Sequence, residues 1–75
     1  MKSKIDLYVI NKVKEKRLAK GWSQFYLADE LGMSAGFIGQ VESPKHPTKY
    51  NLQHVNQLAK IFKCSIHDFL PEKPI

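Results

Sequence analysis

Signals that end and begin helices follow one another at short intervals along this chain, which restricts it to short helical segments. Gly21, Gly32 and Pro44 stand where helices must end, because glycine closes helix C-termini and proline cannot continue a helix. Ser23 and Ser34 follow the two glycines closely, and serine is a favoured N-cap. The period-two alternation that indicates a half-buried strand is absent. The chain is therefore predicted to be all-α, with five helices.

Apolar residues at helical spacing place the expected helices between these signals. Four of the five predicted ranges are Lys4–Lys20, Gln24–Leu31, Ala35–Ser43 and a short last helix from a capping box at Ser65–Asp68 to Leu70. The remaining helix precedes the last one, with Thr48 as the favoured N-cap and Asn51 as the rival. Its apolar face is expected to hold Leu52, Val55, Ala59 and Phe62.

The size and charge of the chain exclude several classes of protein. Residues 1–75 make one domain, too small for an enzyme with a cleft between two lobes. A net charge of +5 favours a polyanionic partner, either nucleic acid or an anionic membrane surface. The single cysteine excludes an internal disulfide and a zinc site built on paired cysteines. No apolar run suits a signal peptide or a membrane span, so a cytoplasmic protein without a membrane partner is expected.

Two of the expected helices are short and are separated by only Gly32 and Met33. A connection of this length forces the helices to cross steeply instead of lying antiparallel. This is the geometry of a helix-turn-helix unit, here at about residues 23–43, whose second helix can enter the major groove of DNA. Short helical hairpins also occur as plain packing units, so the spacing by itself leaves both alternatives open.

Residues along nearly the whole chain, from Val9 to Leu70, carry a resemblance to a known family. They are Arg17, Gly21, Ser23, Gln24, Leu27, Ala28, Gly32, Ser34, Ile38, Glu42, Pro47, Leu52, Ala59 and Phe69. In their order and spacing they resemble the lambda-repressor-like DNA-binding domains of the Cro/Xre type. The resemblance implies a compact five-helix bundle. It also implies a transcriptional regulator that binds a two-fold symmetric operator in double-stranded DNA as a homodimer.

The sequence departs from the family pattern in and after the third helix. Pro44 stands where a glycine usually follows that helix. Gly36 and Gly39 each lower helix stability by about 1 kcal/mol relative to alanine. This recognition helix also contains no lysine or arginine.

Charge is distributed unevenly along the chain. Residues 21–44 hold three anions and no cation, whereas residues 1–20 carry a net charge of +5 and residues 45–75 one of +3. Attraction to DNA phosphates must therefore come from the flanking segments. The expected phosphate contacts are Lys45, His46 and Lys49 in the loop after the recognition helix, and Gln24, which resembles the phosphate-clamping glutamine of the family. Lys2, Lys4 and Lys12 are assigned to solubility.

Base readout is expected from the recognition helix. By resemblance, the positions that face DNA are Ser34, Ala35, Gly36, Phe37, Gly39 and Gln40. Gln40 is the only long hydrogen-bonding side chain among them, and glutamine can pair bidentately with adenine. An A·T-biased half-site follows. An equal alternative is that Phe37 packs on the domain and that the two glycines are merely tolerated.

Arg17 and Glu42 match a pair that, in similar proteins, joins the first and third helices as a structural ion pair. Cys64 takes the place of a small apolar core residue and is expected to be buried and inert. No arrangement of residues suggests a catalytic site, a metal site or a cofactor site. The sequence therefore indicates a protein that is not an enzyme.

The leading functional hypothesis is sequence-specific transcriptional repression by a dimer. Two alternatives stay open. One is the antitoxin of a toxin–antitoxin pair, and the other is a protein-interaction module that has lost DNA binding. The expected dimer surface is the fifth helix and the tail, with Ile66, Phe69, Leu70 and Ile75.

Overall fold

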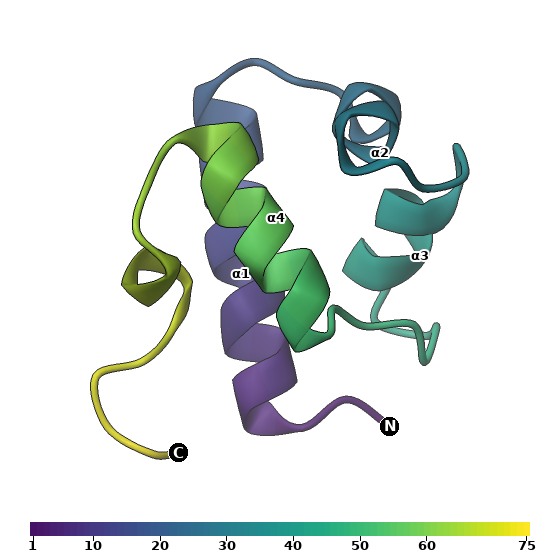
Figure 1. Cartoon of the computed structure of the whole chain (residues 1–75). Helices are drawn as coiled ribbons and strands as arrows, with labels where there is room; N and C mark the ends of the chain where they lie inside the picture. Colours follow the sequence, from purple (N-terminus) through teal and green to yellow (C-terminus); the bar gives the residue numbers. More distant parts are fainter.

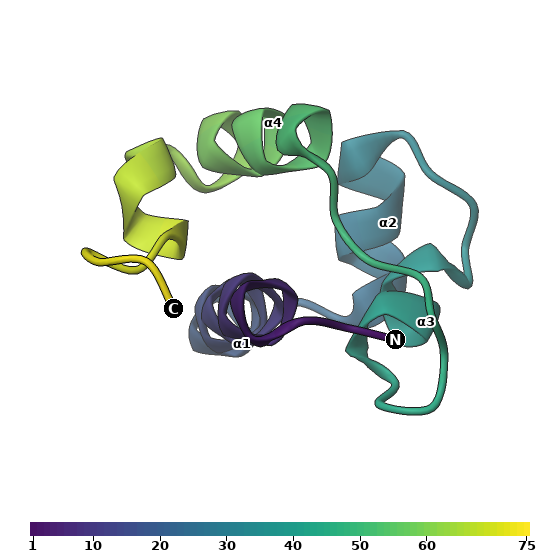
Figure 2. The ribbon, with the colours of Figure 1, turned by 90° about the horizontal axis from the view of Figure 1, so that it is seen from below.

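The computed structural model describes all 75 residues and contains helices but no strand, as the sequence predicts. The α-helices are α1 (Lys4–Ala19), α2 (Gln24–Leu31), α3 (Phe37–Glu42) and α4 (Leu52–Phe62), and a 3₁₀ helix, η1 (Ile66–Phe69), follows them. Figure 1 shows α2 and α3 together on one side of α1 and α4. Seen from below, α1 and α4 form two sides of the bundle, while η1 lies at the end opposite α2 and α3 (Figure 2).

The hydrophobic core receives side chains from every helix. Five of its fully enclosed residues, one from each element, are Val13, Leu27, Ile38, Leu58 and Phe69. Burying an apolar side chain of this size contributes about 1.5–3 kcal/mol. Because Phe69 is among them, η1 is part of the folded unit. Among the charged residues, Arg17 is buried, and the side chain of Glu42 is enclosed as well.

The first two helices begin and end at well-formed caps. Ser23 Oγ accepts a hydrogen bond from the N–H of Tyr26 (3.0 Å), and α2 has the predicted bounds. Gly32 ends α2 with φ 73°, in the left-handed region that favours glycine. α1 begins at a capping box of Ser3 and Asp6, which the sequence interpretation overlooked.

The third helix begins two residues later than predicted, at Phe37 instead of Ala35. Ser34 is not its N-cap: the Ser34 side chain accepts no hydrogen bond from the helix, and its carbonyl accepts the N–H of Phe37 (3.0 Å) in a turn before the helix begins. Gly36 takes the N-cap position, and no side chain caps α3 there. Glycine loses more backbone freedom than any other residue on entering a helix, which favours the turn at this point. The connection between α2 and α3 is therefore residues 32–36.

The prediction that Thr48 caps the fourth helix is wrong, and its rival Asn51 is the N-cap. Asn51 Oδ1 accepts from the N–H of His54 (2.8 Å), and His54 Nδ1 accepts from the N–H of Asn51 (3.1 Å). Thr48 Oγ1 lies 2.9 Å from His46 Nδ1 instead, within the loop. The side chain of Thr48 is thus engaged before the helix begins.

Two further expectations at the C-terminal half need correction. Leu52 does not lie on the buried face of α4: it is 84 % exposed, because it is the first residue of the helix and lies beyond the edge of the core. The fifth helix is the short 3₁₀ element η1, where Ser65 Oγ accepts from the N–H of His67 (3.1 Å) and Asp68 does not complete a capping box. The predicted five-helix bundle is thus present, with a 3₁₀ turn as its last member.

Candidate nucleic-acid interface

An ion pair in a buried position fixes α3 to α1. Arg17 Nε donates to Glu42 Oε2 (3.0 Å), and Arg17 Nη2 donates to Glu42 Oε1 (2.8 Å). The two side chains are only 7 % and 4 % exposed. Arg17 Nη1 also donates to the carbonyl of Trp22 (2.8 Å), and Gln24 Nε2 donates to Glu42 Oε1 (3.0 Å). This network holds the beginning of α2 and the end of α3 on α1, and a bidentate arginine–carboxylate pair fixes orientation as well as distance.

The buried phenol of Tyr50 lies close to this ion pair. Its hydroxyl is buried and has no hydrogen-bond partner. Burial raises the pKa of Tyr50, and the negative charge of Glu42 raises it further. Tyr50 therefore stays neutral and packs as an aromatic core residue.

Four of the six residues assigned to base readout lie exposed. They are Ser34, Ala35, Gly36 and Gln40. Gln40 is the one among them with a long polar side chain, and its Oε1 accepts from Thr48 Oγ1 (3.4 Å). The exposed surface before and along α3 thus consists of small residues around one amide.

Phe37, which the sequence assigns to base contacts, is buried in the domain. Phe37 is 8 % exposed, and its ring centroid lies 5.1 Å from the ring of His54 and 6.1 Å from the ring of Tyr50. Its side chain packs into the domain because α4 and the preceding loop offer aromatic partners. The alternative reading of Phe37 as a packing residue is the one that the structure supports.

Gly39 is half-buried and faces α2. A Cβ atom at this position would lie 3.2 Å from Gln24 Oε1. The absence of a side chain at Gly39 therefore leaves the room that the amide of Gln24 occupies beside Glu42. This glycine serves the packing of α2 on α3.

The residues assigned to phosphate contacts lie at the beginning of α2 and in the loop after α3. Gln24 is exposed at the first position of α2, where its backbone N–H donates to no backbone carbonyl of the chain. A helix N-terminus with free N–H groups favours an anion. Lys45 is exposed and makes no ion pair. His46 is half-buried and lies against Thr48.

Lys49 is the one loop cation with an acidic partner. Its Nζ lies 3.3 Å from Asp6 Oδ2, and its side chain is 52 % exposed. The backbone N–H of Ser3, and then the Ser3 hydroxyl and Lys49, lower the pKa of Asp6, so this partner stays charged. The contact joins the end of the loop to α1.

A lysine that the sequence interpretation assigned to solubility lies at the end of α3. Lys2 Nζ donates to the carbonyl oxygens of Val41 (2.6 Å) and Ser43 (2.7 Å), and more weakly to that of Gln40 (3.5 Å). These acceptors are 38 to 41 residues away in the sequence. No local sequence pattern reveals a contact over such a separation.

The remaining residues show no metal-binding arrangement. No group of three or more His, Cys, Asp or Glu residues is placed to hold a metal ion. Cys64 is half-buried against the core instead of fully buried, and burial raises the pKa of its thiol. None of the helices has the length and apolar character that a membrane crossing needs.

Comparison with protein families gives one match. A family model described as helix-turn-helix matches residues 13–69, which is more than half of the chain. The matched range begins in α1 and ends with η1, so it includes the ion pair, α2, α3 and the loop that follows. Comparison with curated proteins and with solved structures gives no match.

Proposed function

Because the chain belongs to the lambda-repressor-like helix-turn-helix family of Cro/C1 type, whose members bind DNA and regulate transcription, we propose that it recognises one operator as a homodimer and represses transcription there. One observation carries the proposal. A small, exposed surface around Gln40 lies between a helix N-terminus at Gln24 and a cationic loop, and a buried ion pair holds the beginning of α2 and the end of α3 on α1.

The uneven distribution of charge along the chain supports a division of roles between residues that contact phosphates and residues that read bases. The helix-turn-helix segment carries a net charge of −3, so it gains nothing from phosphates except through its helix N-terminus. Lys45 and Lys49 supply the positive charge beside it, and His46 lies in the same loop. Phosphate contacts then set affinity and register, and the surface around Gln40 sets sequence preference. The side chains present there favour an A·T-biased half-site.

The first test of this division is the Gln40→Ala variant. It is expected to weaken binding to the preferred site by about 1–3 kcal/mol and to flatten discrimination at one base pair in each half-site. Gln57→Ala, which removes an exposed glutamine of α4, is the matched control and should leave binding unchanged. Equal losses of affinity on specific and random duplexes would show that Gln40 reads no base.

A homodimer follows from the number of phosphate contacts that one protomer offers. Gln24, Lys45 and Lys49 provide about three, which corresponds to a slope of about −3 in log K against log salt. Such a protomer would barely distinguish its site from bulk DNA. Two protomers related by a two-fold axis double the slope to about −5 or −6 and read two half-sites about 34 Å apart.

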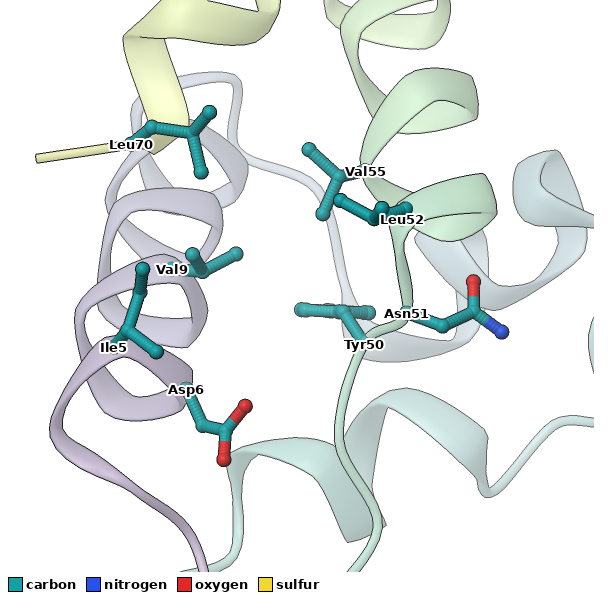
Figure 3. Close-up of a pocket in the computed structure, with 8 residues that line it drawn as sticks. All are labelled: Ile5, Asp6, Val9, Tyr50, Asn51, Leu52, Val55 and Leu70. Atoms are coloured by element: carbon teal, nitrogen blue, oxygen red, sulfur yellow. The ribbon is translucent and has the colours of Figure 1, made fainter.

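A hollow beside the phosphate-binding loop offers a surface for this dimer. Its volume is about 260 Å³, and its lining residues are Ile5, Asp6, Val9, Tyr50, Asn51, Leu52, Val55 and Leu70. Figure 3 shows side chains of α1, α4 and Leu70 facing one another across it. Leu52 projects at its rim, 84 % exposed. A projecting leucine beside an apolar hollow is self-complementary, because a two-fold axis lets each leucine enter the hollow of the other protomer.

The dimer surface that we propose differs from the one that the sequence suggested. Phe69 is fully enclosed in the core and is not available to a partner. Leu70 lines the hollow, whereas Ile66 and Ile75 are exposed and do not line it. Two of its lining residues, Tyr50 and Asn51, directly follow Lys49 in the sequence, so the hollow lies next to the surface assigned to DNA.

The experiment that tests the proposed function is selection of binding sites from random duplexes, followed by anisotropy titration at two salt concentrations. Selected sites with two related half-sites, together with a slope of about −5 or −6, would support it. Weak binding without selection, or binding that salt leaves unchanged, would contradict it and would favour a protein-interaction module.

A further inference from the structure

We propose that Lys2 is a positioning residue for DNA recognition, and that residues 2–6 hold the recognition helix and the phosphate-binding loop in the geometry that DNA requires. The inference rests on the proposed function and adds to it a part of the chain that lies outside the matched family range. It begins from three hydrogen bonds of Lys2 Nζ, to the carbonyls of Gln40, Val41 and Ser43.

α3 has few internal means of keeping its C-terminal end ordered. It has six residues, no side chain caps its N-terminus, and Gly39 lies within it. Near its C-terminal end, the Gln40 carbonyl accepts from the N–H of Ser43 (3.2 Å), and the Ser43 carbonyl accepts from the N–H of His46 (3.2 Å). The Val41 carbonyl, however, has no backbone donor, and Pro44 has no N–H to offer. The ammonium group of Lys2 supplies the donor that the Val41 carbonyl lacks and a second donor to the other two, and a cation at a helix C-terminus also interacts favourably with the helix dipole.

The same N-terminal segment reaches both ends of the loop after α3. Lys2 binds the carbonyl of Ser43, directly before the loop, and Asp6 pairs with Lys49 at its end (3.3 Å). The Ser3–Asp6 capping box fixes these two residues relative to α1. Residues 44–48, which include Lys45 and His46, therefore lie between two contacts with the N-terminal segment, one at Ser43 and one at Lys49. Figure 2 shows the N-terminus beside α3 and this loop.

Lys2 affects DNA binding because it holds these carbonyls, and with them α3 and the loop, in place. It does not contact a DNA phosphate itself. An ammonium group has three donors, and three carbonyl oxygens surround it. Loss of its contacts should therefore disturb where Gln40 and Lys45 are held, while the number of neutralised phosphates stays the same. This separates a positioning role from an electrostatic one.

The test compares Lys2→Met with Lys4→Met in the full chain. Both variants remove one positive charge, but the side chain of Lys4 is exposed and makes no hydrogen bond or ion pair. Lys2→Met is expected to bind the selected operator about tenfold more weakly than Lys4→Met, the size of one charge-assisted hydrogen bond. The salt slopes of the two variants should agree, and the preference for the operator over random duplex should fall only in Lys2→Met.

Nuclear magnetic resonance of the free variants supplies a readout that does not depend on DNA. Lys2→Met should shift the carbonyl carbons of Val41 and Ser43 and raise backbone mobility over residues 44–48, with the core resonances unchanged. Lys4→Met should do neither. Equal operator affinities for the two variants, or unaltered signals at the end of α3, would overturn the inference. If the wild-type protein binds no DNA, the proposed function fails while the contact of Lys2 with α3 is still decided by these signals.

Discussion

Arg17→Ala is expected to lower the free energy of unfolding by about 3–5 kcal/mol, because it leaves the carboxylate of Glu42 buried without its cation. The Glu42 side chain is only 4 % exposed. After the substitution, Gln24 Nε2 remains as its only side-chain donor. The loss also frees the carbonyl of Trp22, which accepts from Arg17 Nη1 in the intact protein.

A loss of this size is decisive for so small a domain. A single core of fewer than about 80 residues supplies only about 3–5 kcal/mol without staples or metals. Arg17→Ala should therefore be largely unfolded at room temperature, which circular dichroism and denaturant titration would measure.

Two control variants isolate the cause of this loss. Lys14→Ala removes an exposed cation of the same helix and should change stability by less than about 0.5 kcal/mol. Replacing both Arg17 and Glu42 by methionine should cost less than Arg17→Ala, since no charge is then stranded. An unfolding midpoint equal to that of the wild type would mean that the pair contributes nothing.

The second large effect is expected from Leu52→Gln, which should separate the homodimer that we propose. A two-fold axis would double every contact, so the variant would remove two buried leucines from one interface. At about 1.5–3 kcal/mol for each, dimerisation should weaken by about 3–6 kcal/mol. Operator complexes should then contain one protomer, and the salt slope should fall from about −6 towards −3.

Sedimentation of the DNA complex is the measurement for this variant. Leu18→Gln serves as its control, because Leu18 is a 59 % exposed leucine that does not line the hollow. If both variants place two protomers on the operator, the dimer surface does not include Leu52. If the wild-type protein places only one protomer there, the proposed homodimer is wrong.

Local signals were sufficient to predict most of the helices. α2 has its predicted bounds because Ser23 and Gly32 act within one turn of the residues that they cap. Prediction failed where two local signals competed. Thr48 and Asn51 are both good caps, and the choice depends on how the loop folds, since Thr48 lies against His46 and Gln40.

The site was harder to predict than the fold because its geometry depends on residues far apart in the sequence. Phe37 could face DNA or the core, and only the rings of Tyr50 and His54 decide between them. Lys2 carries no distinguishing pattern, since its acceptors are backbone carbonyls of α3 and of the residue after it.

The space at Gly39 also limits the mutational routes by which this protein can acquire a new operator. Gly36 has open space around it, so a side chain there meets no neighbour. A side chain at residue 39 meets the Gln24 amide, whose nitrogen is held by Glu42. A side chain at residue 36 can therefore be added to the proposed recognition surface without a shift of its neighbours. A side chain at residue 39 requires the Gln24 amide to shift by a few tenths of an ångström, and so it acts on the contact between Gln24 and Glu42 as well as on the surface.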